Sequence, residues 1–158
     1  MNQLRLALAT SLYLGLAPVA PGTFGTLGGV AIAWALSGTD SFLLWVLLVA
    51  AVLYGVGRSL GAWAEERAAG HDPGWFVLDE VVGYLVTVAW IGGPTPLTLL
   101  TAFCAFRFFD IVKPWPVKRF ERLPGGDGIM ADDVVAGLWA FLAVMLPLRL
   151  FVEAPWTV

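Results

Sequence analysis

Carboxylates occur at three places where the surrounding sequence is strongly apolar. Asp79 and Glu80 are adjacent in VLDEVVGYLV, Asp110 lies in RFFDIVKPWP, and Asp132 and Asp133 precede an apolar segment. Charged groups in such surroundings cost free energy, and within membrane proteins they usually mark functional sites. Carboxylate oxygens without thiol or imidazole neighbours are the hard donors that Mg²⁺ prefers. The five acids are therefore predicted to supply a Mg²⁺ site, as ligands and as groups that orient the ligands.

Cations recur beside the middle acid. Arg107, Asp110 and Lys113 are spaced by three residues, which places them on one face of a helix that the prolines at 114 and 116 then end. Cations flanking an acid suit a substrate phosphate, so Arg107, Lys113 and also Arg119 are predicted to bind one. A ladder of ion pairs within the helix is the alternative for this face, and a structural pairing of Asp79 and Glu80 with these cations is another.

Two glycine-containing stretches are predicted to form turns. In LPGGDGIMADD, Gly125 and Gly126 free the backbone to wrap a phosphate, and Asp132 or Asp133 is expected at the N-terminus of the helix that follows. An N-cap is the alternative role for one of these two aspartates. In APGTFGTLGG, Thr26 is expected to cap a helix that starts near Leu27.

Other chemistries that act on phosphate groups do not fit the sequence. The single cysteine, Cys104, lacks the C-x5-R context of a cysteine phosphatase, and the single histidine, His71, cannot supply a mechanism that needs two. His71 is expected to be a loop residue. Asp127 and Gly128 are followed by IMAD, so the D-G-x2-A-R start of the CDP-alcohol phosphotransferase motif is missing.

The composition indicates an integral membrane protein. The 158 residues are enough for one domain, but 59% are hydrophobic and the mean hydropathy is +0.81. The formal charge of -3 is clustered rather than spread evenly, and it argues against nucleic acid as a partner. We therefore predict an all-α, integral membrane helical bundle that forms a single membrane-embedded domain.

The apolar segments can be paired as hairpins. Residues 3–16 are too short for a straight crossing and are expected at the interface or on the bundle, whereas one long helix from residue 41 should leave the membrane at Arg58. Pairing around SGTD and GGPTP brings the acids and most cations to one side, which the positive-inside rule makes cytoplasmic. Residues 117–124 are expected to form a solvated loop. The remaining apolar segments are residues 75–91, 97–106 and 134–152.

Four ordered motifs carry a resemblance to a known family. They are APGTFGT at 20–26, LDEVVG at 78–83, RFFDIVKPWP at 107–116 and GGDGIMADDVVAG at 125–137. In these motifs the chain resembles the phosphatidylglycerophosphatase A family. The resemblance implies an all-helical, Mg²⁺-dependent lipid phosphatase that converts phosphatidylglycerophosphate to phosphatidylglycerol and phosphate. It also implies a site at the cytoplasmic face of a bacterial inner membrane.

The resulting hypothesis assigns Asp79, Glu80, Asp110, Asp132 and Asp133 to metal binding and catalysis. Water would attack phosphorus with a free carboxylate as base, and a covalent aspartyl-phosphate is the mechanistic alternative. Thr23 and Thr26 are candidates for contacting the glycerol headgroup, with helix capping as the alternative. A small transporter or scaffold with cation-binding carboxylates is the non-enzyme alternative, and homo-oligomerisation is left open.

Overall fold

The structure is a computed structural model that describes residues 2–151, and within them every regular element is helical. The predicted all-α class is therefore confirmed. The elements are α1 (Asn2–Ala9), η1 (Leu14–Leu16), α2 (Pro21–Leu36), α3 (Phe42–Ala68), α4 (Leu78–Val88), α5 (Pro96–Val112), α6 (Val117–Phe120), α7 (Gly126–Ala140), the π-helical segment η2 (Phe141–Met145) and α8 (Leu146–Phe151). The last three form one continuous helix.

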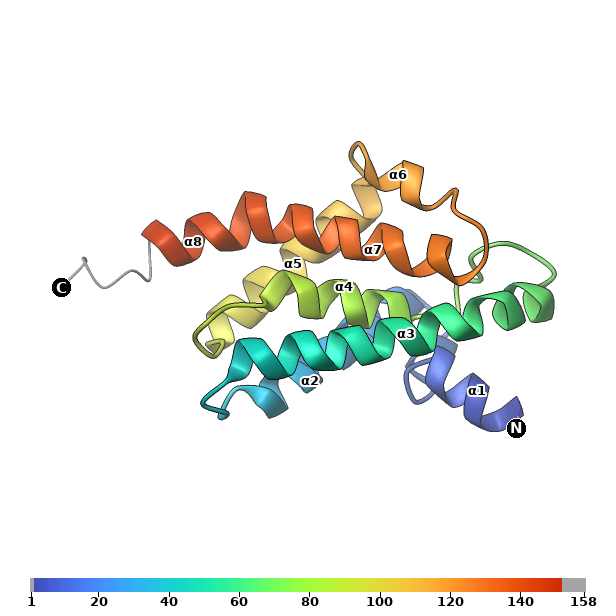
Figure 1. Cartoon of the computed structure of the whole chain (residues 1–158), viewed down its shortest axis with the longest axis horizontal. Helices are drawn as coiled ribbons and strands as arrows, with labels where there is room; N and C mark the ends of the chain where they lie inside the picture. The colour runs from blue at the N-terminus through green and yellow to red at the C-terminus, as the bar shows by residue number, and fades with distance from the viewer. Residues whose placement is uncertain (1, 152–158) are drawn as a thin grey trace.

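Helix α4 lies at the centre of the bundle. It packs against α2, α3, α5 and α7 (Figure 1), and its side chains Val82, Tyr84 and Leu85 are at most 1% exposed. Its 11 residues are about 16 Å of helix, roughly half the thickness of a bilayer core. Burial on all sides, rather than length, accounts for its apolar composition.

Glycines allow the helices to approach α4 closely. A Cβ added to Gly83 of α4 would lie 2.7 Å from the backbone oxygen of Asp133, and one added to Gly137 of α7 would overlap the backbone oxygen of Gly83. The matching face on α2, where Gly25 and Gly29 pack against the N-cap residue Val77 and Tyr84 of α4, was not predicted from the sequence. Small residues at such positions let two helix backbones touch, as in membrane bundles.

The start of α2 differs from the prediction. The helix begins at Pro21 rather than near Leu27, and Thr26 lies inside it, where its hydroxyl donates to the backbone oxygen of Gly22 at 2.8 Å. Thr26 is therefore not an N-cap. Proline suits the first position of a helix because its missing N–H would have had no partner there. The glycines that looked like turn formers instead make the face that packs on α4.

The start of α7 also differs. The helix begins at Gly126, so Asp132 and Asp133 lie in its second turn and neither is an N-cap. A glycine is required at position 126 because a Cβ there would overlap the backbone oxygen of Arg58 in α3. The preceding residues 117–124 are not simply a solvated loop, since they contain α6, in which Val117 is fully buried.

Among residues 2–151, two helices are long and apolar enough to cross a membrane, namely Phe42–Ala68 and Gly126–Phe151. Only 22% and 28% of their most apolar windows are buried within the structure. The core helix of a soluble protein would be mostly covered, whereas α3 leaves large side chains such as Leu44, Leu48 and Val52 exposed. Their exposure is consistent with a lipid environment. The long helix expected to run past Arg58 is confirmed.

The charged residues meet at one end of the bundle. The first turns of α2, α4 and α7 lie there, together with the last turns of α3 and α5 (Figure 1). The connections at residues 37–41 and 89–95 lie at the opposite end (Figure 1). A capping box between Thr95 and Thr98 starts α5 directly after the predicted GGPTP turn. The expected hairpins around SGTD and GGPTP are therefore present.

Candidate metal and phosphate site

Three of the predicted acids come together between α4 and α7. One carboxylate oxygen each of Asp79, Glu80 and Asp133 lies within 4.8 Å of the others. Asp79 and Asp133 are 6% and 3% exposed, and the backbone N–H of Glu80 donates to Asp79 Oδ1 at 3.0 Å. Adjacent residues on a helix diverge by about 100°. An oxygen of each nevertheless comes within 4.8 Å of one on Asp133, because Gly83 in the second turn of α4 lets the α7 backbone at Asp133 approach closely.

The donor set fits a hard divalent cation. Within residues 2–151, none of these three carboxylates forms a salt bridge, and Glu80 Oε2 is buried without a hydrogen-bond partner. Clustered, buried carboxylates with no cation would carry a large desolvation and repulsion cost. A bound cation removes that cost, and oxygen-only donors match Mg²⁺ or a similar ion. We refer to Asp79, Glu80 and Asp133 as the acidic triad.

The ion pair between Arg107 and Asp110 flanks the acidic triad. Arg107 Nη1 donates to Asp110 Oδ2 at 2.6 Å, and both side chains are largely buried. The charge of Asp110 acts on Glu80 and Asp133. The intrahelical ion pair that the sequence left as an alternative is thus present, and it lies next to the acids of α4 and α7. The charge of Arg107 also acts on Glu80.

Lys113 binds Asp132, the neighbour of Asp133 on α7. Its Nζ donates to Asp132 Oδ2 at 2.8 Å and lies 3.4 Å from Glu121 Oε1. Burial lowers the pKa of the Lys113 amine, but the hydrogen bond and the charges of Asp132 and Glu121 outweigh it and raise the pKa overall. Asp132 is therefore neutralised by a fixed cation, whereas its neighbour Asp133 belongs to the acidic triad.

The first turn of α2 forms a wall of the site that the sequence did not reveal. A Cβ added to Gly22 would overlap Glu80 Oε1 and lie 3.0 Å from Arg107 Nη1. The N-terminus of α2, which is the positive end of its helix dipole, thus faces the carboxylate of Glu80 and the guanidinium of Arg107. Thr23 is half-buried on this turn, and Thr26 is fully buried one turn further along. The only sequence signal for Gly22 was its place in the APGTFGT motif.

Asp72 is a second residue that sequence reasoning missed. It lies in the connection between α3 and α4 with a positive φ of 46° and is half-buried. Burial raises the pKa of its carboxyl, and the charge of Lys113 acts against that rise. The charge of Asp72 in turn acts on Asp79 and Asp132. Its neighbour His71 is a loop residue as predicted, and it contacts Glu65 and the backbone oxygen of Glu121.

The other predicted phosphate-binding residues lie near the α6 connection. Arg119 stacks on the ring of Trp115, with its guanidinium carbon 5.6 Å from the ring centroid. Gly125 has a φ of +60°, a conformation that favours glycine, and Gly126 packs against the backbone of α3. This close packing explains why residue 126 is a glycine. Phosphate binding by Arg119, Gly125 and Gly126 stays a prediction.

Comparison with known proteins adds an independent line of support. A model of the family described as phosphatidylglycerophosphatase A matches residues 7–148. Phosphatidylglycerophosphatase A of Haemophilus influenzae is 38% identical over 148 residues, covering 91% of this chain and 88% of the relative. The protein of the same name from Escherichia coli K12 is 35% identical over 136 residues, covering 83% and 76%.

A third relative has a different name. A Bacteroides thetaiotaomicron protein named provisionally as a phosphatidylinositol-3-phosphatase is 36% identical over 148 residues, covering 89% of this chain and 91% of the relative. No solved structure matches the chain. The similarity therefore extends over most of the chain, and the relatives carry the names of two different lipid phosphatases.

Proposed function

This chain belongs to the phosphatidylglycerophosphatase A family and is a phosphatase, and from that premise we propose that it is a Mg²⁺-dependent enzyme that hydrolyses phosphatidylglycerophosphate to phosphatidylglycerol and phosphate. The observation that carries the proposal is the acidic triad: among residues 2–151 no cation forms a salt bridge with its largely buried carboxylates, while Arg107 and Lys113 are held by the neighbouring Asp110 and Asp132. A transporter or scaffold does not account for such a site in a family of phosphatases.

Asp79, Glu80 and Asp133 would hold the metal, with Asp110 and Asp132 supporting them. A bound Mg²⁺ supplies charge neutralisation for the phosphate oxygens. Arg107 and Lys113 are placed to bind the phosphate, and each is already held by an aspartate at 2.6 and 2.8 Å. Cations held this close to the reacting phosphate stabilise the charge that develops in phosphoryl transfer.

Proton transfer is assigned to Asp110. When Arg107 turns to the substrate phosphate, Asp110 loses its cationic partner while it stays beside Glu80 and Asp133. A carboxylate freed in this way can accept the proton of the attacking water. A covalent aspartyl-phosphate remains the mechanistic alternative, and trapping of labelled phosphate on the protein would distinguish it.

The membrane orientation follows from the cations. Arg58 pairs with Asp127 in the first turn of α7, and Arg67 lies in the last turn of α3. The basic residues of the segment 107–122 lie in the last turns of α5 and just beyond it, at the same end of the bundle as the site. Cationic residues next to membrane spans favour the cytoplasmic side. We therefore place the site at the cytoplasmic face of a bacterial inner membrane, where a lipid headgroup can reach it from the bilayer surface.

Phosphate release by the purified protein tests the proposal. Phosphatidylglycerophosphate should be hydrolysed with Mg²⁺ and not after chelation. The Asp133→Asn variant should lose at least about 100-fold in kcat/KM, while Asp40→Asn, at an exposed residue at the opposite end, should match the wild type. Metal-independent release, or full activity of Asp133→Asn, would contradict the proposal.

The name of the Bacteroides relative supplies a second candidate substrate, phosphatidylinositol 3-phosphate. Both lipids are phosphate monoesters, so the same carboxylates and cations would serve either one. The two headgroups should therefore be compared as competing substrates in one assay. Preference for the inositol lipid would keep the lipid phosphatase assignment and replace the substrate.

A further inference from the structure

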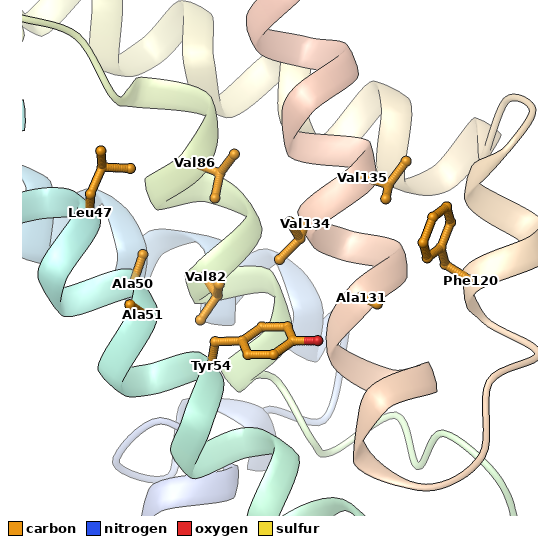
Figure 2. A pocket seen from close by; sticks show the side chains of 10 residues that line it. All are labelled: Leu47, Ala50, Ala51, Tyr54, Val82, Val86, Phe120, Ala131, Val134 and Val135. Carbon is orange, nitrogen blue, oxygen red and sulfur yellow. The ribbon is translucent and has the colours of Figure 1, made fainter.

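An apolar groove lies between α3 and α7, with α4 as its floor. Figure 2 shows Leu47 and Tyr54 on the α3 side, Val134 on the α7 side, and Val82 and Val86 of α4 between them. The cavity has a volume of about 330 Å³. The hydroxyl of Tyr54 is the one polar side-chain group among the lining residues. An apolar molecule rather than a polar one is therefore the expected occupant.

The groove shares a face of α4 with Asp79 of the acidic triad. Val82 and Val86 follow Asp79 by three and seven residues, so all three lie on one face of α4. This face extends about 10 Å along the helix axis at roughly 1.5 Å per residue. On α7, the lining residues Ala131, Val134 and Val135 lie within one helical turn of Asp133. A molecule bound by its phosphate at the acids would place its next part at the entrance of the groove.

The two walls are the helices that can cross a membrane. Phe42–Ala68 and Gly126–Phe151 supply the α3 and α7 sides of the groove. At the end marked by Tyr54, Arg58 and Asp127 pair at 2.7 Å, and both of their charges act on the Tyr54 hydroxyl. The groove thus has a polar end beside Arg58 and Asp127 and an apolar end further along the spans, which is the polarity of a phospholipid.

We propose that this groove binds one fatty acyl chain of the phospholipid substrate and so positions the headgroup phosphate at the acidic triad. The proposal rests on the proposed lipid phosphatase function. Unlike a free apolar molecule, an acyl chain of the substrate is covalently attached to the reacting headgroup. This attachment explains why an apolar groove should lie on the same face of α4 as Asp79. The chain then restricts the headgroup to one approach, which raises the fraction of productive complexes.

A substitution that fills the groove tests the proposal. Ala51 is exposed and lines the α3 wall (Figure 2), so Ala51→Trp should occupy the space without disturbing the core. For dioleoyl phosphatidylglycerophosphate in mixed micelles, kcat/KM should fall about tenfold because the displaced chain loses buried methylene contacts. For the deacylated headgroup, glycerophosphoglycerophosphate, it should stay within about twofold of the wild-type value.

Val52→Trp is the matched control, because Val52 is 59% exposed on the same helix and does not line the groove. It should leave both substrates unaffected. Equal losses of Ala51→Trp on both substrates, no loss on the lipid, or an equal loss in Val52→Trp would overturn the groove assignment. A wild-type protein that hydrolyses neither substrate would instead overturn the proposed function.

A photoreactive lipid tests the groove in the unmodified protein. Phosphatidylglycerol with a diazirine in the middle of one acyl chain should label peptides that contain residues 47–54 and 131–135 after irradiation in lipid nanodiscs. A larger apolar cavity of about 540 Å³ lies on the other flank of α4, against α1, η1 and α2. Preferential labelling of that cavity, uniform labelling of the lipid-facing surface, or a second copy cross-linked through the groove would each overturn the proposal.

Discussion

Replacing Gly22 by alanine should separate the geometry of the site from the stability of the fold. The new Cβ would overlap Glu80 Oε1 and lie 3.0 Å from Arg107 Nη1. Glu80 Oε1 is at the far end of a flexible side chain, so the clash can be relieved by moving the carboxylate. We therefore expect Gly22→Ala to fold with near-normal stability and to displace one member of the acidic triad.

The size of the effect follows from the displacement. Restoring an ordinary contact of 3.4 Å or more to the Cβ requires the carboxylate to move by about 1 Å. A misplacement of roughly 1 Å in a catalytic constellation can cost about 100-fold in rate, or about 2.7 kcal/mol in the barrier. The loss should be accompanied by weaker Mg²⁺ activation, measured as the Mg²⁺ concentration that gives half-maximal phosphate release.

Two other glycine substitutions provide the controls. Gly29 lies on the same face of α2, but a Cβ there would meet Tyr84 Cβ and Cγ at 3.1 and 3.2 Å, close to the α4 backbone. Gly29→Ala should therefore destabilise the fold by about 1–3 kcal/mol through overpacking. A Cβ on Gly55 in α3 would meet nothing within 4 Å, so Gly55→Ala should be neutral or stabilising by up to about 1 kcal/mol.

Full activity and normal Mg²⁺ activation of Gly22→Ala would contradict this role of Gly22. The role would also be refuted if Gly22→Ala lost stability as Gly29→Ala does and its activity per folded molecule were unchanged. Either result would mean that Gly22 is required for helix packing and not for the position of Glu80. Thermal unfolding in detergent and phosphate release on the same samples would decide between these outcomes.

Two further predictions concern ion pairs at the edge of the site. Lys113→Met should destabilise the protein by about 3 kcal/mol because Asp132 is left buried without its cation, and adding Asp132→Asn should recover most of the loss in chemical denaturation. His71 contacts Glu65 and the backbone oxygen of Glu121, and these contacts, the backbone one first, raise its pKa above 6.5. The stability that His71 adds is therefore complete below pH 6.5 and is lost as the pH rises through the folded-state pKa. His71→Gln should remove this pH dependence, and an unchanged pH profile of the unfolding free energy would contradict it.

The long apolar helices and the gathering of charge at one end could be predicted from the sequence. An apolar segment from residue 41 that turns polar after Arg58 indicates one helix, and α3 runs from Phe42 to Ala68. The spacing of Arg107, Asp110 and Lys113 predicted a shared face, and Arg107 and Lys113 do hold neighbouring acids. These inferences rest on periodicity and on the cost of burying charge, both of which are local properties of the chain.

The predicted starts of α2 and α7 were wrong because glycine can either form a turn or allow close packing within a helix. Gly22 and Gly126 were interpreted as parts of turns, yet both lie inside the first turn of a helix. Each allows a close contact with a segment distant in the sequence, namely Glu80 for Gly22 and the α3 backbone for Gly126. Local propensity does not contain this information, because the benefit of a missing Cβ depends on which helix packs there.

Asp72 was missed for a related reason. It follows the only histidine in a loop of small and polar residues, where an acid usually means a solvated turn. Only the return of the chain from α3 into α4 brings it close enough for its charge to act on Asp79 and Asp132. A loop acid just ahead of an LDE motif on a buried helix is a signal that could be used in related sequences.

The two aspartates at 132 and 133 show how the charges of the site are divided. Asp132 and Asp110 each hold a cation, while the acidic triad holds none among residues 2–151. If Arg107 and Lys113 were instead bonded to the acidic triad, they would compete with a metal for the same oxygens and would be unavailable to a phosphate. Holding each cation on a separate aspartate keeps it near the acidic triad and outside it. The arrangement therefore leaves three carboxylates for a divalent ion and two cations for the substrate, which is the division that a metal-dependent phosphatase requires.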